Sequence, residues 1–314
     1  MRFVILVAAI TPPLLILGYG IAKARGTWYS EATWNAFFVG AVSAMAAIAC
    51  EFAVSYVLPL DQIGPVAGSA VKAILVAAIP EEAIKFFVLV SLAEKHVDVR
   101  RLQDILVLAL AVSLGFATLE NFFYVISVDH WKTAAAIRAI TAVPGHGIDG
   151  LAMGALLIVA RMNGGNSFWS ARYALAVPIV LHAAYDFPLF AIKKAGATIW
   201  FGSAWLAIIL LSSLCVITLC NRVIPRAVAA DRAAGRDGTS TETTDRLIVG
   251  GMIGTLIGPL LIAAAFYGRG FEFASLAMIL SIFPVALGID SILTGLRRRK
   301  VRLAAITPNL EYIH

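Results

Sequence analysis

Three ionisable side chains lie close together in the apolar stretch 79–87, where Glu81, Glu82 and Lys85 interrupt a run long enough to cross a bilayer. Charged groups at the centre of a membrane are costly, so such residues commonly have a functional role. Glu81 and Lys85 are four residues apart and share a helix face, so the lysine can neutralise part of the charge of the glutamate pair. A carboxylate in such a site is a candidate general base for water.

Three further motifs follow in the next apolar runs: Phe116 with Glu120 and Asn121, then His146, then His182 with Asp186. Residues four apart face the same side of a helix, so His182 and Asp186 are expected to lie next to each other on one helix face. An Asp one turn away can hold the orientation of an imidazole ring. Carboxylates and imidazoles together are groups that move protons, and they are also ligands that zinc binds.

The composition indicates the elements that must position these side chains. With 60% hydrophobic and 14% charged residues, the chain is far more apolar than a water-soluble globule. We predict an all-α polytopic membrane bundle of about nine transmembrane helices. The predicted spans are 3–22, 35–58, 69–92, 104–127, 134–160, 172–192, 198–220, 247–267 and 273–296.

The distribution of basic residues predicts the topology. Seventeen Lys and Arg fall on one side of the nine spans and six on the other, which places the N-terminus outside and the C-terminus in the cytoplasm. The same bias favours a retained first helix over a signal peptide. We expect a seven-helix part over 1–220 with the catalytic core in 69–192, a flexible cytoplasmic linker over 221–246, two further helices over 247–296 and a basic cytoplasmic tail over 297–314.

Helical rise predicts that the four motifs meet at mid to outer depth in the membrane. Any one of them has an ordinary structural explanation, such as an ion pair between Glu81 and Lys85, but the coincidence of all four at one depth favours function. Glu51 and Arg138 we interpret as packing or interfacial residues. The three cysteines all fall in apolar spans, which indicates neither a disulfide framework nor Cys-x-x-Cys metal spacing.

The order Glu-Glu-x-x-Lys, Phe-x-x-x-Glu-Asn, His, His-x-x-x-Asp resembles the PrsW family of intramembrane proteases, a relative of the CAAX-processing and bacteriocin-processing membrane proteases. The resemblance covers about residues 69–192. It implies that Glu81 and Glu82 are the essential glutamates and that His146 and His182 are the catalytic histidines, with Glu120 and Asn121 as the second motif. It also implies a first, extracytoplasmic cut in a membrane-bound anti-sigma factor.

The resulting hypothesis is a metal-independent intramembrane endopeptidase. Glu81 or Glu82 activates water, His146 and His182 stabilise the oxyanion and the leaving amine, and Asp186 orients His182. Asn121 adds a donor, Lys85 offsets the glutamate charge, Phe116 forms a wall and Glu120 has no assigned step. We expect no cofactor, a membrane-anchored protein substrate, no nucleic acid, and an integral position in a bacterial inner membrane.

Three alternatives remain open. Glu81, Glu82, His146 and His182 would also suit a zinc protease. Intramembrane acids and histidines also build proton or ion pathways in transporters, although the last three spans show no matching motifs. A catalytically silent immunity or scaffold protein is the third possibility. The sequence leaves open the substrate, the oligomeric state and which glutamate is the base.

Overall fold

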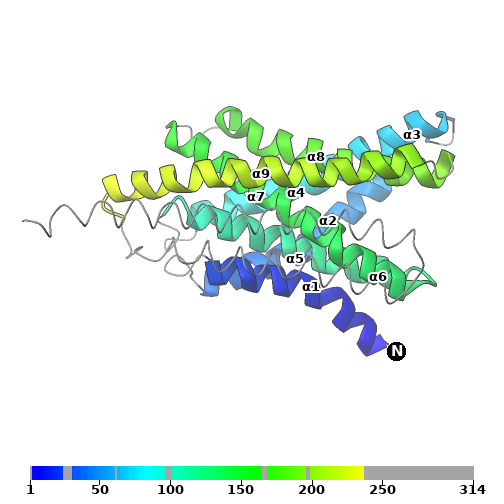
Figure 1. The fold of residues 1–314 in the computed structure, drawn as a ribbon, viewed down its shortest axis with the longest axis horizontal. Helices are drawn as coiled ribbons and strands as arrows, with labels where there is room; N and C mark the ends of the chain where they lie inside the picture. The colour runs from blue at the N-terminus through cyan, green and yellow to red at the C-terminus, as the bar shows by residue number, and fades with distance from the viewer. Residues whose placement is uncertain are drawn as a thin grey trace, which may run out of the picture. The chain divides into compact units, whose positions relative to one another are not determined.

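The computed structural model describes residues 2–23, 30–60, 62–95, 101–164, 168–195 and 199–236, and every regular element in these ranges is a helix. The predicted helices over 247–296 and the basic tail lie outside these residues. The elements in chain order are α1 (Arg2–Lys23), α2 (Ser30–Val57), α3 (Pro65–Val71), the π-helical segment η1 (Lys72–Ala78), α4 (Ile79–Lys95), α5 (Asp104–Ile126), α6 (Trp131–Ile140), α7 (Ala142–Met162), α8 (Phe168–Ala195) and α9 (Ile199–Ala233) (Figure 1).

Five stretches of these helices are long and apolar enough to cross a membrane: Glu31–Val57, Asp104–Ile126, Trp131–Met162, Ala171–Lys193 and Gly202–Ala233. They correspond to five of the nine predicted spans. The first predicted span is a helix with a shorter apolar stretch, Leu6–Ile21. The all-α membrane architecture is therefore confirmed, whereas the number nine and the orientation of the termini stay predictions.

Helix α5 forms the centre of the bundle and packs against α1, α2, α4, α6 and α7 (Figure 1). Two glycines let α2 and α5 touch through their backbones. A Cβ at Gly40 would collide with the backbone of Val112, and one at Gly115 would collide with the backbone of Phe37. Lipid provides little hydrophobic drive between helices, so close packing of this kind holds membrane helices together.

Two prolines shape the helices that carry the site. Pro80 lacks the N–H that would bond one turn back, and the wider π turns of η1 end two residues before it, at Ala78. The span predicted over 134–160 is broken at Thr141, which separates α6 from α7 three residues before Pro144. Proline in the first turn of a helix is tolerated because its missing N–H would have no partner there. The break therefore marks the true start of α7.

Helix α9 is longer than predicted. The linker expected over 221–246 is helical as far as Ala233, because Val223 and Ala227 are buried against the bundle and extend its core beyond the predicted span end. Proline at position 225 lies inside this helix. The remainder of the predicted linker, from 237 onward, lies outside the described residues.

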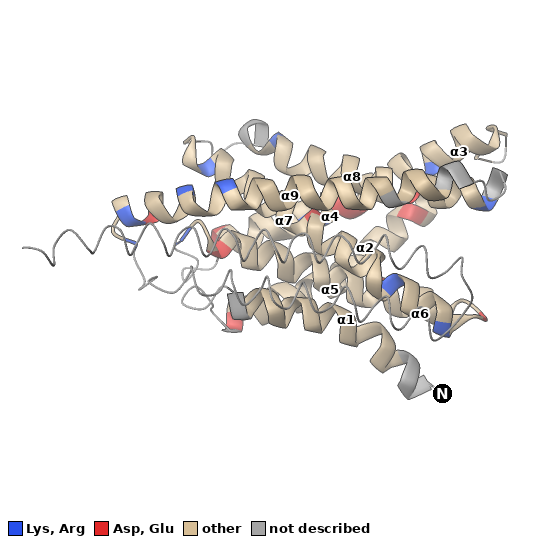
Figure 2. Ribbon diagram, viewed as in Figure 1, with Lys and Arg blue, Asp and Glu red and all other residues tan. Residues whose placement is uncertain are grey.

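Charged positions lie at the ends and on the central part of the bundle (Figure 2). Most Lys and Arg positions are towards the two ends of the helices, whereas acidic positions occur both at the ends and on the central part. Most residues along α5 are apolar and buried. The charged side chains in the middle therefore face one another rather than the surrounding lipid, which is the usual arrangement for functional intramembrane charges.

Candidate active site

The glutamate pair on α4 surrounds a fully buried lysine. Lys85 Nζ donates to Glu82 Oε1 at 2.7 Å and to Glu81 Oε2 at 3.3 Å. The exposed fraction of Lys85 and of Glu82 is 0%, and that of Glu81 is 5%. Removing Lys85 or Glu82 would leave the charge of its partner buried and less well compensated, so the pair with the shorter contact is costly to break. The predicted neutralisation by Lys85 is seen directly in these contacts.

His182 on α8 lies between two carboxyl groups. Its Nδ1 donates to Glu82 Oε1 at 2.7 Å and lies 3.9 Å from Glu81 Oε2, and its Nε2 is 3.4 Å from Asp186 Oδ2. The predicted pairing of His182 with Asp186 is present, but the contact of His182 with Glu82 is shorter. Two carboxyl groups from two helices thus fix the plane of this ring.

His146 on α7 connects the α4 cluster to α5. Its Nδ1 lies 3.0 Å from Lys85 Nζ, and its Nε2 lies 2.7 Å from Glu120 Oε2. An ammonium group can only donate, so Nδ1 is the acceptor and the ring proton is on Nε2, where it points to Glu120. Glu120 therefore sets the tautomer of His146, a function the sequence did not assign to it.

Arg138 on α6 completes the charged network. Its Nη2 lies 2.7 Å from Glu120 Oε1, and its Nε donates to Asn121 Oδ1 at 2.7 Å. Asn121 is fully buried, and its amide nitrogen donates to the carbonyl of Ala9 at 3.2 Å. Both ends of the Asn121 amide have partners, with one of its two N–H groups used by Ala9, and its role as a donor at the reacting carbonyl stays a prediction. Asn121 holds Arg138 in place.

Phe116 is buried one turn before Glu120, and its role as a wall of the site stays a prediction. The Lys85 ammonium lies 4.2 Å from the centre of its ring, and the ring of His146 is 6.0 Å away. The rings of His146 and His182 meet edge to face at 5.5 Å. An aromatic face attracts a nearby cation. The ring of Phe116 therefore helps to keep the ammonium group among the carboxylates.

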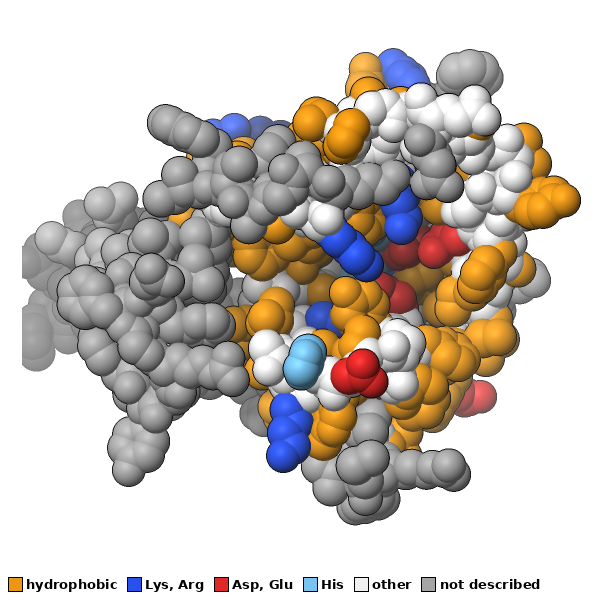
Figure 3. Space-filling model, turned by 90° about the vertical axis from the view of Figure 1, so that its right-hand side faces the viewer, with side chains coloured by type: hydrophobic (Ala, Val, Ile, Leu, Met, Phe, Trp, Pro, Cys, Tyr) orange, Lys and Arg blue, Asp and Glu red, His pale blue; other side chains and the backbone are white. Residues whose placement is uncertain are grey.

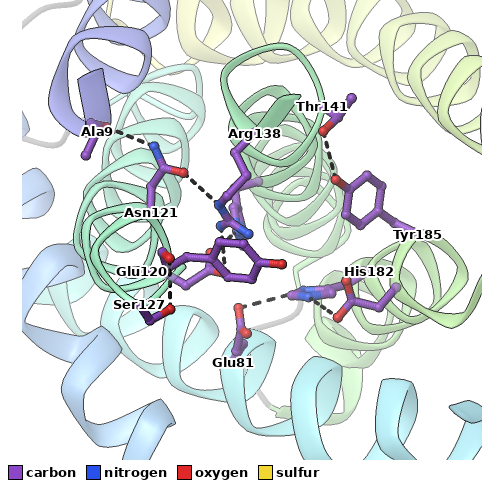
Figure 4. Close-up of polar contacts among 12 residues, drawn as sticks. Ala9, Glu81, Glu120, Asn121, Ser127, Arg138, Thr141, His182 and Tyr185 are labelled. Atoms are coloured by element: carbon purple, nitrogen blue, oxygen red, sulfur yellow. Dashed lines mark hydrogen bonds and ion pairs between the residues drawn. The ribbon is translucent and has the colours of Figure 1, made fainter. Parts of the chain in front are cut away.

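These side chains border a cavity of about 90 Å³, which exceeds the space that one water needs. Glu81, Glu120, His146, His182 and Asp186 line it, whereas Glu82 lies behind this surface. Figure 3 shows charged side chains at the bottom of a hollow between apolar walls. In the close-up, Glu81 and His182 point towards each other, and Arg138 reaches Asn121 (Figure 4).

Sequence reasoning missed four groups at this site. Arg138, interpreted as interfacial, pairs with Glu120, and Glu51 on α2 lies near enough to Glu81 for the two carboxyl groups to interact. Asp149 is buried at the cavity, and Tyr185 Oη donates to the hydroxyl of Thr141 at 3.0 Å. Asp149 follows His146 by three residues, so helical spacing could have found it. Arg138 and Glu51 come from other helices and carry no such local signal.

The cluster also meets the chemical requirements of a metal site. Glu81, Glu82, His146 and His182 each offer one ligand atom, and the four atoms lie within 4.8 Å of one another. Two imidazoles and two carboxylates suit zinc. Glu82 Oε2 is buried without a hydrogen-bond partner among the described residues, as expected for an oxygen that could accept a cation. A metal ion at this site would require the Lys85 ammonium to move away or to share its partners with the ion, because the ammonium contacts three of these side chains.

Comparisons with known proteins identify the family of the chain. The model of the family described as PrsW family intramembrane metalloprotease matches residues 17–217. A Bacillus subtilis protein named Protease PrsW is 32% identical over 195 residues, which cover 61% of this chain and 85% of the relative. Protease PrsW of Oceanobacillus iheyensis is 30% identical over 188 residues, 59% of this chain and 82% of the relative.

Protease PrsW of Geobacillus kaustophilus is 34% identical over 143 residues, which cover 46% of this chain and 62% of the relative. No solved structure matches this chain. The matched family range begins in α1 and ends in α9, and so contains all four helices that carry the predicted motifs. The chain belongs to the PrsW family of intramembrane proteases and is a membrane peptidase.

Proposed function

We propose that Glu81 is the general base of an intramembrane endopeptidase. The observation that carries this assignment is the division of the glutamate pair. Glu81 lines the cavity with both histidines, whereas Glu82 is fully buried and binds Lys85 and His182 through one oxygen. A base must reach the proton that it takes, and of the two carboxylates Glu81 is the one on the cavity surface.

In the proposed reaction, Glu81 takes a proton from a water in the cavity while the water oxygen bonds to the scissile carbonyl carbon. The C–N bond then breaks, and the proton passes from Glu81 to the leaving amine. His146 and His182 line the cavity, and their ring N–H groups now face carboxylates. In the proposed reaction these N–H groups exchange a carboxylate partner for the developing oxyanion and stabilise it. Preorganised donors of this kind contribute about 3–4 kcal/mol each.

The substrate of this reaction is a membrane-anchored protein. The charged hollow lies within a bundle of apolar helices, so a peptide bond reaches it from a chain that is itself held at the membrane. The resemblance described above favours an anti-sigma-factor type of substrate cut on the extracytoplasmic side. We propose a multi-pass position in a bacterial inner membrane, in which the end of the bundle with the hollow faces outward.

A cleavage assay with a single-span reporter tests the assignment. Separate Glu81→Gln, His146→Ala and His182→Ala variants are expected to abolish cleavage while remaining inserted and folded. Glu94→Gln is the matched control, because Glu94 is an exposed carboxylate on the same helix. Cleavage by Glu81→Gln at the rate of the control would refute the role of Glu81 as base. Membrane proteomics with Glu81→Gln would then identify substrates as proteins that accumulate uncut.

A metal-dependent reaction is the second candidate, favoured by the convergence of the four ligand atoms. Glu81, Glu82, His146 and His182 would hold the ion, which when bound would polarise the carbonyl or activate water. The metal content of the purified protein, with cleavage measured before and after chelation, separates the two. A metal-free protein that cleaves fully supports the glutamate reaction. One tightly bound zinc per chain, with activity lost on chelation and restored by zinc, supports the metal.

A further inference from the structure

A second cavity lies at the far end of the bundle from the active site. Its volume is about 350 Å³. The lining comes from the start of α5 and the residues before it, from the end of α7, and from the end of α9 and the residues after it. The lining residues are Arg101, Leu102, Ile105, Arg161, Met162, Ala230 and Arg236. On α7, fifteen positions separate His146 from Arg161, which is about 22 Å of helix. Three of its seven lining residues are arginines, and we name it the basic cavity.

Hydrogen bonds and ion pairs join the elements that frame the basic cavity. The buried Asp231 of α9 accepts the backbone N–H of Leu102 with both oxygens, at 2.9 and 3.1 Å, and also binds Arg236 Nε at 3.0 Å. Asp104 accepts the backbone N–H of Arg101 at 3.1 Å, and its other oxygen is 3.7 Å from Arg101 Nε. Each aspartate therefore ties the entry of α5 to an arginine and to the backbone.

Arg161 differs from the other two arginines. Within the ranges that the structure describes it makes no ion pair or hydrogen bond, and the acidic side chain that acts on it from a distance is Glu94 of α4. A guanidinium group has five N–H donors and no acceptor. The basic cavity thus contains donors for which the protein itself provides no acceptor in those ranges.

The position of the cavity indicates which acceptor reaches it. Arg161 and Met162 end one candidate membrane span, and Asp104 begins another, so the lining lies where apolar helix gives way to polar surface. Lipid phosphates occupy this level of a bilayer. The planar guanidinium matches two phosphate oxygens at once, which makes arginine well suited to this ligand.

We propose that the basic cavity binds a phosphate-bearing anion through Arg161, with Arg101 and Arg236 as flanking charges. An anionic phospholipid headgroup and a soluble phosphate share this chemistry. The site is separate from the peptidase cavity, so it is independent of the roles proposed for Glu81 and the histidines.

Binding to the purified full chain in detergent tests the proposal. Short-chain phosphatidylglycerol, the phosphatidylcholine of equal chain length and inorganic phosphate are titrated separately, and the shift in thermal unfolding temperature is measured. The wild type is expected to be stabilised in a saturable way by phosphatidylglycerol. Arg161→Gln should weaken that binding at least tenfold, and Arg161→Lys should weaken it less because it keeps the charge.

Arg226→Gln is the matched control, since Arg226 is an exposed arginine near the same end of α9 that does not line the cavity. Its binding should stay within twofold of wild type. Equal stabilisation by inorganic phosphate would support the site and assign it to a soluble phosphate rather than to lipid. No saturable effect of either anion, or equal loss in Arg161→Gln and Arg226→Gln, would overturn the proposal. Unchanged helical content and elution of both variants exclude a folding defect.

Discussion

The central charged cluster and the basic cavity both place charges inside a helical membrane bundle, but they treat those charges in opposite ways. In the cluster, Lys85 has two carboxylate partners and Arg138 has Glu120. In the basic cavity, Arg161 has no such partner among the described residues. A network whose charges satisfy one another holds a fixed geometry, as catalysis requires. A site with donors in excess is instead suited to a ligand that comes and goes.

The largest expected effect is the loss of cleavage in a Glu81 variant, which tests whether this residue serves catalysis or stability. Glu81→Gln keeps the shape of the side chain and removes the proposed base, so reporter cleavage should fall about 10²–10⁴-fold, the usual contribution of general base catalysis. The unfolding temperature should stay near that of the wild type, because Lys85 retains its shorter contact with Glu82. A large loss of stability in Glu81→Gln would instead place Glu81 in the structural part of the network.

Removing the cation tests how strongly the cluster depends on internal pairing. Lys85→Met keeps the length of the side chain but leaves Glu82 buried beside His182 without its lysine partner. The free energy of unfolding should fall by about 3–5 kcal/mol. Adding Glu82→Gln should restore part of this loss, which denaturation in detergent would measure. Equal stability of the single and double variants would show that Glu82 is not the group that Lys85 compensates.

A smaller effect is expected at the edge of the network. Arg138→Gln removes the ion pair to Glu120 and so loosens the group that sets the tautomer of His146. We expect kcat to fall about tenfold or more, in keeping with a lost hydrogen bond to a charged group, with little change in KM. Arg138→Lys should recover part of kcat. A change confined to KM would argue that Arg138 binds substrate rather than positioning Glu120.

The smallest effect should come from the basic cavity. Without anionic lipid, Arg161→Gln should change the free energy of unfolding by less than about 0.5 kcal/mol, because no ion pair within the described ranges is lost. Thermal unfolding of the variant in lipid-free detergent measures this. A loss as large as that in Lys85→Met would mean that Arg161 has a structural partner, and the contrast between the two regions would fail.

The sequence alone was sufficient to pair residues that lie on the same helix face and to single out charged residues within apolar runs. Glu81, Lys85, His182 and Asp186 could be paired by spacing, and their contacts follow it. Arg138 could not be placed, because the break at Thr141 puts it on a separate short helix. Which glutamate lines the cavity also needed the structure, since neighbours on a helix point about 100° apart.

The π-helical segment before Pro80 has a consequence for how the chain tolerates a change of length. A π turn contains one more residue per hydrogen-bonded ring than an α turn. Deleting one residue within 72–78 would let this stretch close into α-helix, and the helical segments on its two sides would keep nearly the same relative orientation. The chain can therefore lose a residue in this segment without turning Glu81 away from the cavity.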